Sequence, residues 1–180
     1  AAAPVVLVTG CFVENEEHAL NDERITYVVD NDRKASIFEI IDGHLNGVPV
    51  DLHALTADRF SFGDSGGGFH TRRAIKVQDG CDNFCTFCII PHVRGKAVSM
   101  PVDRVIRQAS EAIQAGAKEI VMTGVNIGRY RYNNVGFAEL LEKVLDLDGD
   151  FRVRVSSIEP DGGNRTGSWE SGFLNLVDHP

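Results

Sequence analysis

The stretch "PVDRVIRQASEAIQAGAKEIVMTGVNIG", residues 101–128, decides the fold of this chain because its hydrophobic period changes once. Its first half repeats apolar residues at helical spacing: Val102, Val105, Ile106, Ala109, Ala112 and Ile113. Gly116 then supplies a helix stop, and residues 119–125 ("EIVMTGV") predict a strand. A helix that leads directly into a buried strand is the repeating unit of α/β domains.

The same alternation continues on both sides of this stretch. Residues 74–77 ("AIKV") predict an earlier strand, residues 137–145 a second helix and residues 152–158 ("RVRVSSI") a third strand. This order predicts parallel strands with right-handed crossovers, in either a doubly wound sheet or part of a (β/α) barrel. Chemistry gathers at the carboxyl ends of the strands in both folds. We therefore expect one shared site in the segments that follow the three strands: residues 80–95, 123–128 and 156–160.

The amino-terminal residues predict a separate, smaller α/β unit. Residues 5–10 ("VVLVTG") and 25–29 ("ITYVV") are expected to form strands. The helix after them has an apolar face that consists of Ile37, Ile40, Ile41 and Leu45. Because a chain rarely opens on a central buried strand, we expect this unit to be the C-terminal half of a small α/β domain. With the glycine-rich residues 63–70 as a break, the predicted division is a partial amino-terminal domain (1–51), a linker (52–72) and a truncated core domain (73–180).

Composition places limits on the function. The 180 residues are 43% hydrophobic and 24% charged, which are ordinary values for a soluble globular protein. No apolar run approaches the roughly 20 residues of a membrane helix, and no basic residue precedes Arg24, so neither a membrane span nor a secretory signal is predicted. Cysteines that cluster rather than spread in even pairs favour a metal role in a reducing cytoplasm over disulfides.

The formal charge of −8 is unevenly distributed along the chain. Residues 71–107 carry 7 basic and 3 acidic side chains, residues 1–70 carry 4 and 12, and residues 108–180 carry 7 and 11. The only basic stretch therefore surrounds the cysteines. It is either a solvated face with a few extra cations or a surface that brings a polyanionic substrate to the cysteine site.

Three of the four cysteines lie in "GCDNFCTFCIIPHVRG", residues 80–95: Cys81, Cys85 and Cys88. Zinc usually takes four ligands in two separated pairs, so a zinc site here would need His92 as an unusual fourth ligand. Iron–sulfur clusters take closely spaced cysteines on one loop, with the last ligand from elsewhere. Either Cys11 closes such a cluster for electron transfer, or one iron stays open and binds a substrate.

The spacing C-x-x-x-C-x-x-C after the first strand of a (β/α) domain resembles that of the radical S-adenosylmethionine (SAM) enzymes. This resemblance implies a partial (β/α) barrel of the TIM type with a 4Fe-4S cluster on Cys81, Cys85 and Cys88. It also implies that SAM binds the open iron. One electron, from a donor such as flavodoxin or ferredoxin, then converts SAM to a 5′-deoxyadenosyl radical.

The same resemblance implies contacts with SAM at the strand ends, and no catalytic side chain. The reaction implied by the resemblance takes place at C2 of an adenine base in the substrate. This C2–H bond is neither acidic nor open to nucleophilic attack, so general acid–base groups would not suffice. The implied cofactor contacts are Phe87 beside the adenine, Thr123, Gly124 and Asn126 at the methionine moiety, and Ser157 and Glu159 at the ribose hydroxyls.

Longer segments resemble the methylthiotransferases within that family, which insert sulfur and a methyl group at an unactivated C–H bond. Residues 75–95 ("IKVQDGCDNFCTFCIIPHVRG") look like their signature, and residues 5–16 ("VVLVTGCFVENE") look like the last cysteine segment of their amino-terminal domain. Cys11 is then implied to hold a second, auxiliary 4Fe-4S cluster with ligands outside this chain. The chain is accordingly expected to be part of a longer enzyme.

Two shorter segments carry the expected substrate. "TGVNIGRY" (123–130) and "RVSSIEP" (154–160) look most like the branch that methylthiolates threonylcarbamoyladenosine beside the tRNA anticodon, at adenine C2. The expected partner is therefore tRNA, with no DNA and no membrane. The alternatives are a methylthiotransferase for isopentenyladenosine in tRNA or for a ribosomal protein, and a zinc-stabilised RNA-binding module without catalysis.

Overall fold

The computed structural model describes residues 4–14, 20–48, 50–61, 71–158 and 176. The chain divides into two compact units, a smaller one with residues 1–66 and 86–94 and a larger one with residues 67–85 and 95–180. None of the helices in the described ranges has the length and apolar character that a membrane crossing requires.

The larger unit is built on a four-stranded sheet that is mainly parallel. Its strands, in spatial order, are β4 (Val98–Ser99), β3 (Arg72–Asp79), β5 (Glu119–Gly124) and β8 (Arg152–Val155). The last three run parallel to one another, and the short β4 pairs with β3 antiparallel at the edge. These parallel strands are the three predicted from the hydrophobic pattern, although β8 ends at Val155 rather than at residue 158.

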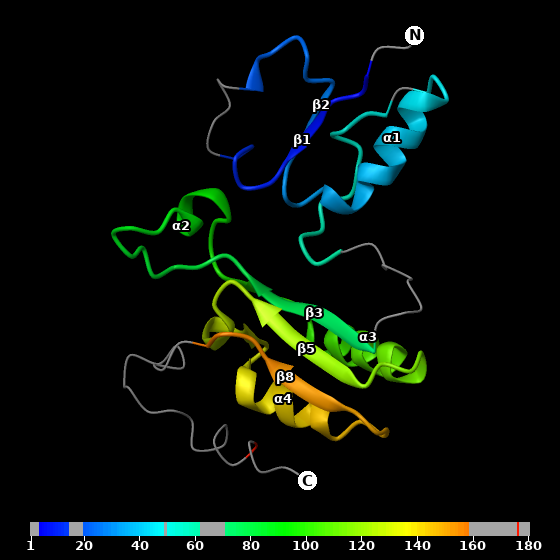
Figure 1. Ribbon diagram of the computed structural model, residues 1–180. Helices are drawn as coiled ribbons and strands as arrows, with labels where there is room; N and C mark the ends of the chain where they lie inside the picture. Colours follow the sequence, from blue (N-terminus) through cyan, green and yellow to red (C-terminus); the bar gives the residue numbers. More distant parts are fainter. Residues whose placement is uncertain (1–3, 15–19, 49, 62–70, 159–175, 177–180) are drawn as a thin grey trace. The chain divides into compact units, whose positions relative to one another are not determined.

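Two helices connect the parallel strands and pack side by side on one face of the sheet (Figure 1). α3 (Val102–Gln114) links β3 to β5, and α4 (Phe137–Leu145) links β5 to β8. The predicted mixed α/β fold with a parallel sheet is therefore confirmed. The core of this unit includes six side chains with no exposed surface: Val105, Ala109, Ile120, Met122, Leu140 and Val144.

The connection from β5 to α4 is a compact series of turns. It comprises η3 (Ile127–Arg129) and a small antiparallel pair, β6 (Arg131–Tyr132) and β7 (Val135–Gly136). Tyr130 is buried, and its hydroxyl donates to Met100 O at 2.8 Å. Because burial raises the pKa of Tyr130 above its usual value, this hydroxyl stays protonated and holds the connection in place.

The smaller unit contains a parallel pair of strands and one longer helix. Its elements are β1 (Leu7–Thr9), β2 (Tyr27–Val29), η2 (Lys34–Ser36), α1 (Ile37–Leu45) and α2 (Ile90–Val93). β1 and β2 pair from Leu7↔Tyr27 to Thr9↔Val29. The two strands and the helix predicted for this part of the chain are confirmed, and both strands are shorter than predicted.

The predicted apolar face of α1 is wrong at its last residue. Leu45 is 73% exposed, whereas Ile40 is completely buried. The chain leaves α1 through Gly47 and turns back onto Gly43, where Val48 N donates to Gly43 O at 2.8 Å. Leu45 lies two residues after Gly43, about 200° further around the helix, so the returning chain does not cover it.

Candidate functional site

The three segments predicted to share a site follow β3, β5 and β8. Because these strands are parallel neighbours, their carboxyl ends lie at the same end of the sheet. The segments after β3 and β5 meet there, with Asn126 Nδ2 at 3.9 Å from Cys81 Sγ. Ser157, in the segment after β8, is exposed, and Glu159 lies outside the described residues.

The cysteine loop begins with a turn that requires glycine. Gly80 has a φ of +72°, and a Cβ at this position would lie 2.1 Å from Lys96 O and 2.7 Å from Gly95 O. The backbone can make this close approach only because glycine has no side chain. Cys81 N then donates to Gly95 O at 3.1 Å, which sets the position of the buried Cys81 side chain.

The three loop cysteines differ in exposure. Cys81 is buried, Cys88 is partly exposed and Cys85 is exposed, and all three are free thiols. Within the described residues, no three His, Cys, Asp or Glu side chains lie close enough together to hold a metal ion. The donor chemistry of three thiols on one short loop nevertheless fits an iron–sulfur cluster. Phe87, in the same loop, is 91% exposed, so its ring is accessible to a ligand.

Asn126 is the buried polar residue of the segment after β5. Its backbone N–H donates to Gln78 Oε1 at 2.7 Å, whereas its side-chain Oδ1 is buried without a hydrogen-bond partner in the described part of the chain. A buried oxygen left unpaired costs about 1–3 kcal/mol. Asn126 Oδ1 is therefore a candidate acceptor for a donor group on a ligand. Thr123 and Gly124, the other predicted residues of this segment, end β5 and are partly exposed.

Gln78, which was not among the predicted site residues, is completely buried in β3. Its Nε2 donates to Asp79 O at 2.9 Å and to Gly80 O at 2.7 Å, while its Oε1 accepts the Asn126 N–H. Asp79 is buried as well, and its carboxylate pairs with Lys76 Nζ at 2.5 Å. The signal was present in the sequence, because Gln78 and Asp79 directly follow the predicted strand at residues 74–77 and precede the cysteine loop.

A further contact joins the segments after β3 and β5. Arg129 Nη2, in η3, donates to Asn83 Oδ1 in the cysteine loop. The backbone N–H of Arg129 donates to Asn126 O at 3.0 Å, so the same turn also fixes Asn126. The cysteine loop and the turn after β5 are therefore attached to each other by side chains from both.

The basic stretch at residues 71–107 does not form one surface around the cysteines. Arg72 pairs with Glu119 at the amino-terminal ends of β3 and β5. Lys76 is mostly buried in its pair with Asp79. Three of the seven cations of this stretch, Arg72, Arg73 and Lys76, are instead distributed along β3, and two of them form ion pairs within the chain.

Cys11 lies in the smaller unit, in the turn that follows β1, and is partly exposed. Its Sγ accepts a hydrogen bond from Arg94 Nε at 3.3 Å. The role of Cys11 as a cluster ligand stays a prediction.

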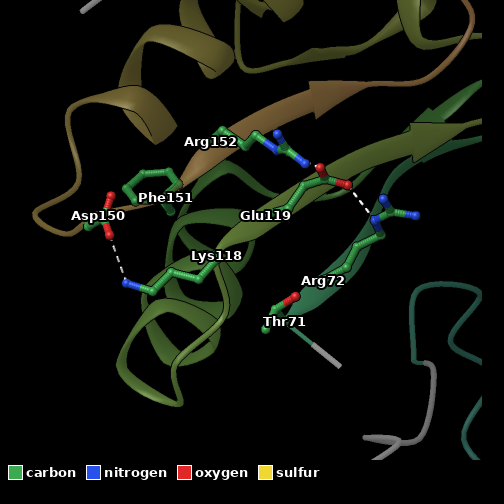
Figure 2. Close-up of a pocket in the computed structure, with 7 residues that line it drawn as sticks. All are labelled: Thr71, Arg72, Lys118, Glu119, Asp150, Phe151 and Arg152. Carbon is green, nitrogen blue, oxygen red and sulfur yellow. Dashed lines mark hydrogen bonds and ion pairs between the residues drawn. The ribbon is translucent and has the colours of Figure 1, made fainter. Parts of the chain in front are cut away.

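The opposite end of the sheet, where these strands begin, has a cavity of different character (Figure 2). It is lined by residues at the starts of β3, β5 and β8: Thr71, Arg72, Lys118, Glu119, Asp150, Phe151 and Arg152. Arg152 Nε donates to Glu119 Oε2 at 2.7 Å, and Arg154 Nε lies 3.3 Å from Glu119 Oε1. Burial opposes ionisation of Glu119, but the hydrogen bond from Arg152 and the charges of all three arginines hold its pKa below the usual value. This carboxylate is already occupied by cations of the chain itself.

Comparisons with known proteins match this chain to a family. The family model described as "Radical SAM superfamily" matches residues 75–164. A threonylcarbamoyladenosine tRNA methylthiotransferase of Chlamydia pneumoniae is 33% identical over 158 residues, which are 87% of this chain and 35% of that protein. One of Treponema pallidum is 39% identical over 130 residues, 72% of this chain and 24% of that protein. A tRNA-2-methylthio-N(6)-dimethylallyladenosine synthase of Pelagibacter ubique is 31% identical over 167 residues, 87% of this chain and 37% of that protein.

These matches confirm the predicted resemblance to the radical SAM methylthiotransferases. The residues covered by the family model include the cysteine loop, the turn after β5 and all of β8. The chain spans between 24% and 37% of the length of these three curated relatives.

Proposed function

The chain belongs to the radical SAM superfamily, and on that premise we propose that it is part of a tRNA methylthiotransferase that acts on threonylcarbamoyladenosine at adenine C2. Relatives whose names state this substrate support the proposal, as do residues 123–130 and 154–160. A dimethylallyladenosine synthase matches at similar identity, so the choice of base is the part that needs a direct test.

One observation carries the proposal: Cys81 and Asn126, which follow different strands, meet at the carboxyl ends of the parallel strands. Cys81, Cys85 and Cys88 would hold a 4Fe-4S cluster, and three thiolates leave one iron for SAM. When bound together, the cluster and SAM supply a 5′-deoxyadenosyl radical, which removes hydrogen from C–H bonds that acids and bases do not activate. The donor chemistry of the loop fits this group.

The side chains around the loop bind and orient the cofactor. Asn126 Oδ1, buried and lacking a partner among the described residues, would accept a hydrogen bond from the methionine moiety of SAM. Thr123 and Gly124 form the adjoining backbone, and the exposed ring of Phe87 offers a face to the adenine. Ser157 and Glu159 are assigned to the ribose hydroxyls on the basis of the resemblance.

We extend the proposal to the architecture of the whole protein. The order β3, β5, β8 does not reverse, and both connecting helices pack on one face, which supports a partial (β/α) barrel over a doubly wound sheet (Figure 1). In this scheme residues 1–51 belong to the amino-terminal domain, residues 52–72 are the linker and residues 73–180 belong to the barrel. Cys11 would hold the auxiliary 4Fe-4S cluster with ligands outside this chain.

The partners follow from the same chemistry. The substrate is a tRNA, and an electron donor such as flavodoxin or ferredoxin reduces the cluster in the cytoplasm. DNA and membranes have no part in the proposed reaction.

Anaerobic reconstitution of the purified protein tests the cofactor. We expect a brown, oxygen-sensitive protein with about four irons at the cysteine loop. SAM should change the electron paramagnetic resonance (EPR) spectrum of the reduced cluster. Asn126→Ala should keep its iron but bind SAM about tenfold more weakly, the effect of one lost hydrogen bond. Gln114→Ala, a change on the exposed side of α3, should alter neither property. A colourless protein with one zinc, or an EPR spectrum that SAM leaves unchanged, would contradict the proposal.

Mass spectrometry of tRNA nucleosides tests the substrate. Cells that lack the full-length gene should lose the methylthio group from threonylcarbamoyladenosine and regain it when the gene is returned. If the isopentenyl nucleoside loses its methylthio group instead, the assigned base is wrong.

A further inference from the structure

We propose that Gln78 is a positioning residue that attaches the turn after β5 to the start of the cysteine loop and thereby sets the affinity for SAM. This inference rests on the proposed function, because it assigns Asn126 and Cys81 to one cofactor site. Gln78 itself does not touch the cofactor. It acts through the backbone of residues on both sides of that site.

The hydrogen bonds of Gln78 define the orientation of its side-chain amide. The amide oxygen accepts from Asn126 N at 2.7 Å, and the amide nitrogen donates to Asp79 O at 2.9 Å and Gly80 O at 2.7 Å. The reversed amide would place N–H against N–H and oxygen against two carbonyl oxygens. A completely buried side chain therefore bridges the last residue of β3, the glycine before Cys81 and the segment after β5.

An irregularity of β3 turns Gln78 toward β5. The register runs Lys76↔Thr123 and then Gln78↔Gly124, which leaves Val77 as an extra residue. Val77, Gln78 and Asp79 are all buried, whereas a regular strand alternates its faces. Bulges of this kind re-aim side chains and are common beside functional sites. This bulge brings a polar side chain into the interior immediately before the cysteine loop.

Gly124 provides the space that Gln78 occupies. A Cβ at residue 124 would lie 3.0 Å from Gln78 O, 3.1 Å from its Cβ and 3.1 Å from its Oε1. Such contacts are tighter than most side chains make, so a side chain at residue 124 would require Gln78 to shift by a few tenths of an ångström. The placement of Asn126, two residues further on, depends on the close approach of β5 to Gln78.

Loss of the Gln78 amide would leave buried groups unpaired on both sides of the site. Asn126 N–H would lose its acceptor, and Asp79 O and Gly80 O would lose the Gln78 donor. The buried Asn126 side chain would then no longer be held beside Cys81, from which its Nδ2 is 3.9 Å away. The expected consequence is weaker SAM binding while the cysteines themselves remain.

The experiment compares Gln78→Met with the wild-type protein and with Ile120→Val. Methionine has a similar size and flexibility but forms no such hydrogen bonds, whereas Ile120→Val removes one methylene from the same sheet, at the other end of β5. Three properties are measured: amide hydrogen exchange at residues 124–129 before reconstitution, iron content after it, and SAM affinity of the reconstituted protein.

We expect Gln78→Met to speed exchange at residues 124–129, to keep most of the iron and to bind SAM about tenfold or more weakly. Ile120→Val should stay within about twofold of wild type in SAM affinity. Wild-type exchange and SAM affinity in Gln78→Met, or an equal loss in Ile120→Val, would overturn the inference. If the wild-type protein takes up no iron or does not bind SAM, the proposed function has failed instead.

A second variant covers the case in which Gln78→Met does not fold. Gln78→Glu keeps an oxygen toward Asn126 N but replaces the donor to Asp79 O and Gly80 O with an acceptor. We expect it to protect the amide of Asn126 better than methionine does and to weaken SAM binding about threefold to tenfold. Wild-type affinity in this variant would also overturn the inference.

Discussion

Buried polar groups have different partners at the two ends of β3, β5 and β8. At the amino end, Glu119 is surrounded by guanidinium groups from the strands on both sides, Arg72 of β3 and Arg152 of β8 (Figure 2). At the carboxyl end, Asn126 Oδ1 has no partner among the described residues and lies in a segment that contacts the free thiol of Cys81. The same strands therefore have one end whose charges are paired and one end with groups left over for a ligand.

This difference indicates how a parallel sheet separates stability from chemistry. The starts of the strands are held together by ion pairs that the chain completes by itself. At the carboxyl ends, β3 has a bulge and leads into a glycine turn and a loop of thiols, and Asn126 Oδ1 is buried without a partner among the described residues, which costs stability without a ligand. Substitutions at the two ends should consequently have different effects, and three of them test the comparison.

The largest effect is expected for Cys85→Ser at the carboxyl end. Cys85 is exposed and contributes little packing, so the unfolding free energy of the cluster-free protein should change by less than about 0.5 kcal/mol. Reconstituted protein should nevertheless lose about four irons per chain. Metal analysis and thermal unfolding check both parts, with Thr86→Ser as a neighbouring control that keeps its iron. Retention of the full iron content by Cys85→Ser would break the comparison.

An intermediate effect is expected for Gly80→Ala. The new methyl group would combine a positive φ with a 2.1 Å approach to Lys96 O, so we expect about 2–4 kcal/mol of destabilisation. Gly95→Ala is the matched control, because Gly95 has a φ of +68° but no atom within 4 Å of its Cβ position. That control should cost only about 1 kcal/mol. Equal losses for both variants in urea unfolding would show that close approach is not what Gly80 provides.

The smallest effect is expected for Glu119→Gln at the amino end. Because its folded pKa is lowered, Glu119 contributes stability above its unfolded pKa of about 4.5, and this contribution is lost as pH falls through the folded pKa. The variant should therefore melt about 2–4 °C below wild type at pH 7 and approach it below pH about 4.5. Iron content should be unaffected. Asp150→Asn, which changes an exposed pair with Lys118, should match wild type at both pH values. A loss of iron in Glu119→Gln would show that the two ends are not separable.

Much of the larger unit was predictable because its elements follow local patterns. The apolar spacing from Val102 to Ile113 corresponds to α3, and the next apolar run corresponds to β5. Parallel connectivity then predicted that the cysteine loop and Asn126 would both lie at the carboxyl ends of the strands, and they do. The exposed Leu45 was not predictable from the spacing of α1, because it depends on where the chain returns after the helix.

The sequence by itself determined which elements form, which residues carry thiols and at which end of the sheet these thiols lie. These features depend on hydrophobic period, residue type and strand direction. Only the tertiary structure decided that Gln78 joins Asn126 to the start of the cysteine loop, and that Arg72 serves Glu119 rather than the cysteines. The physical reason is that a hydrogen bond or an ion pair depends on distances of a few ångströms between strands. Those distances follow from the register and the bulge of β3, which no local pattern in the sequence specifies.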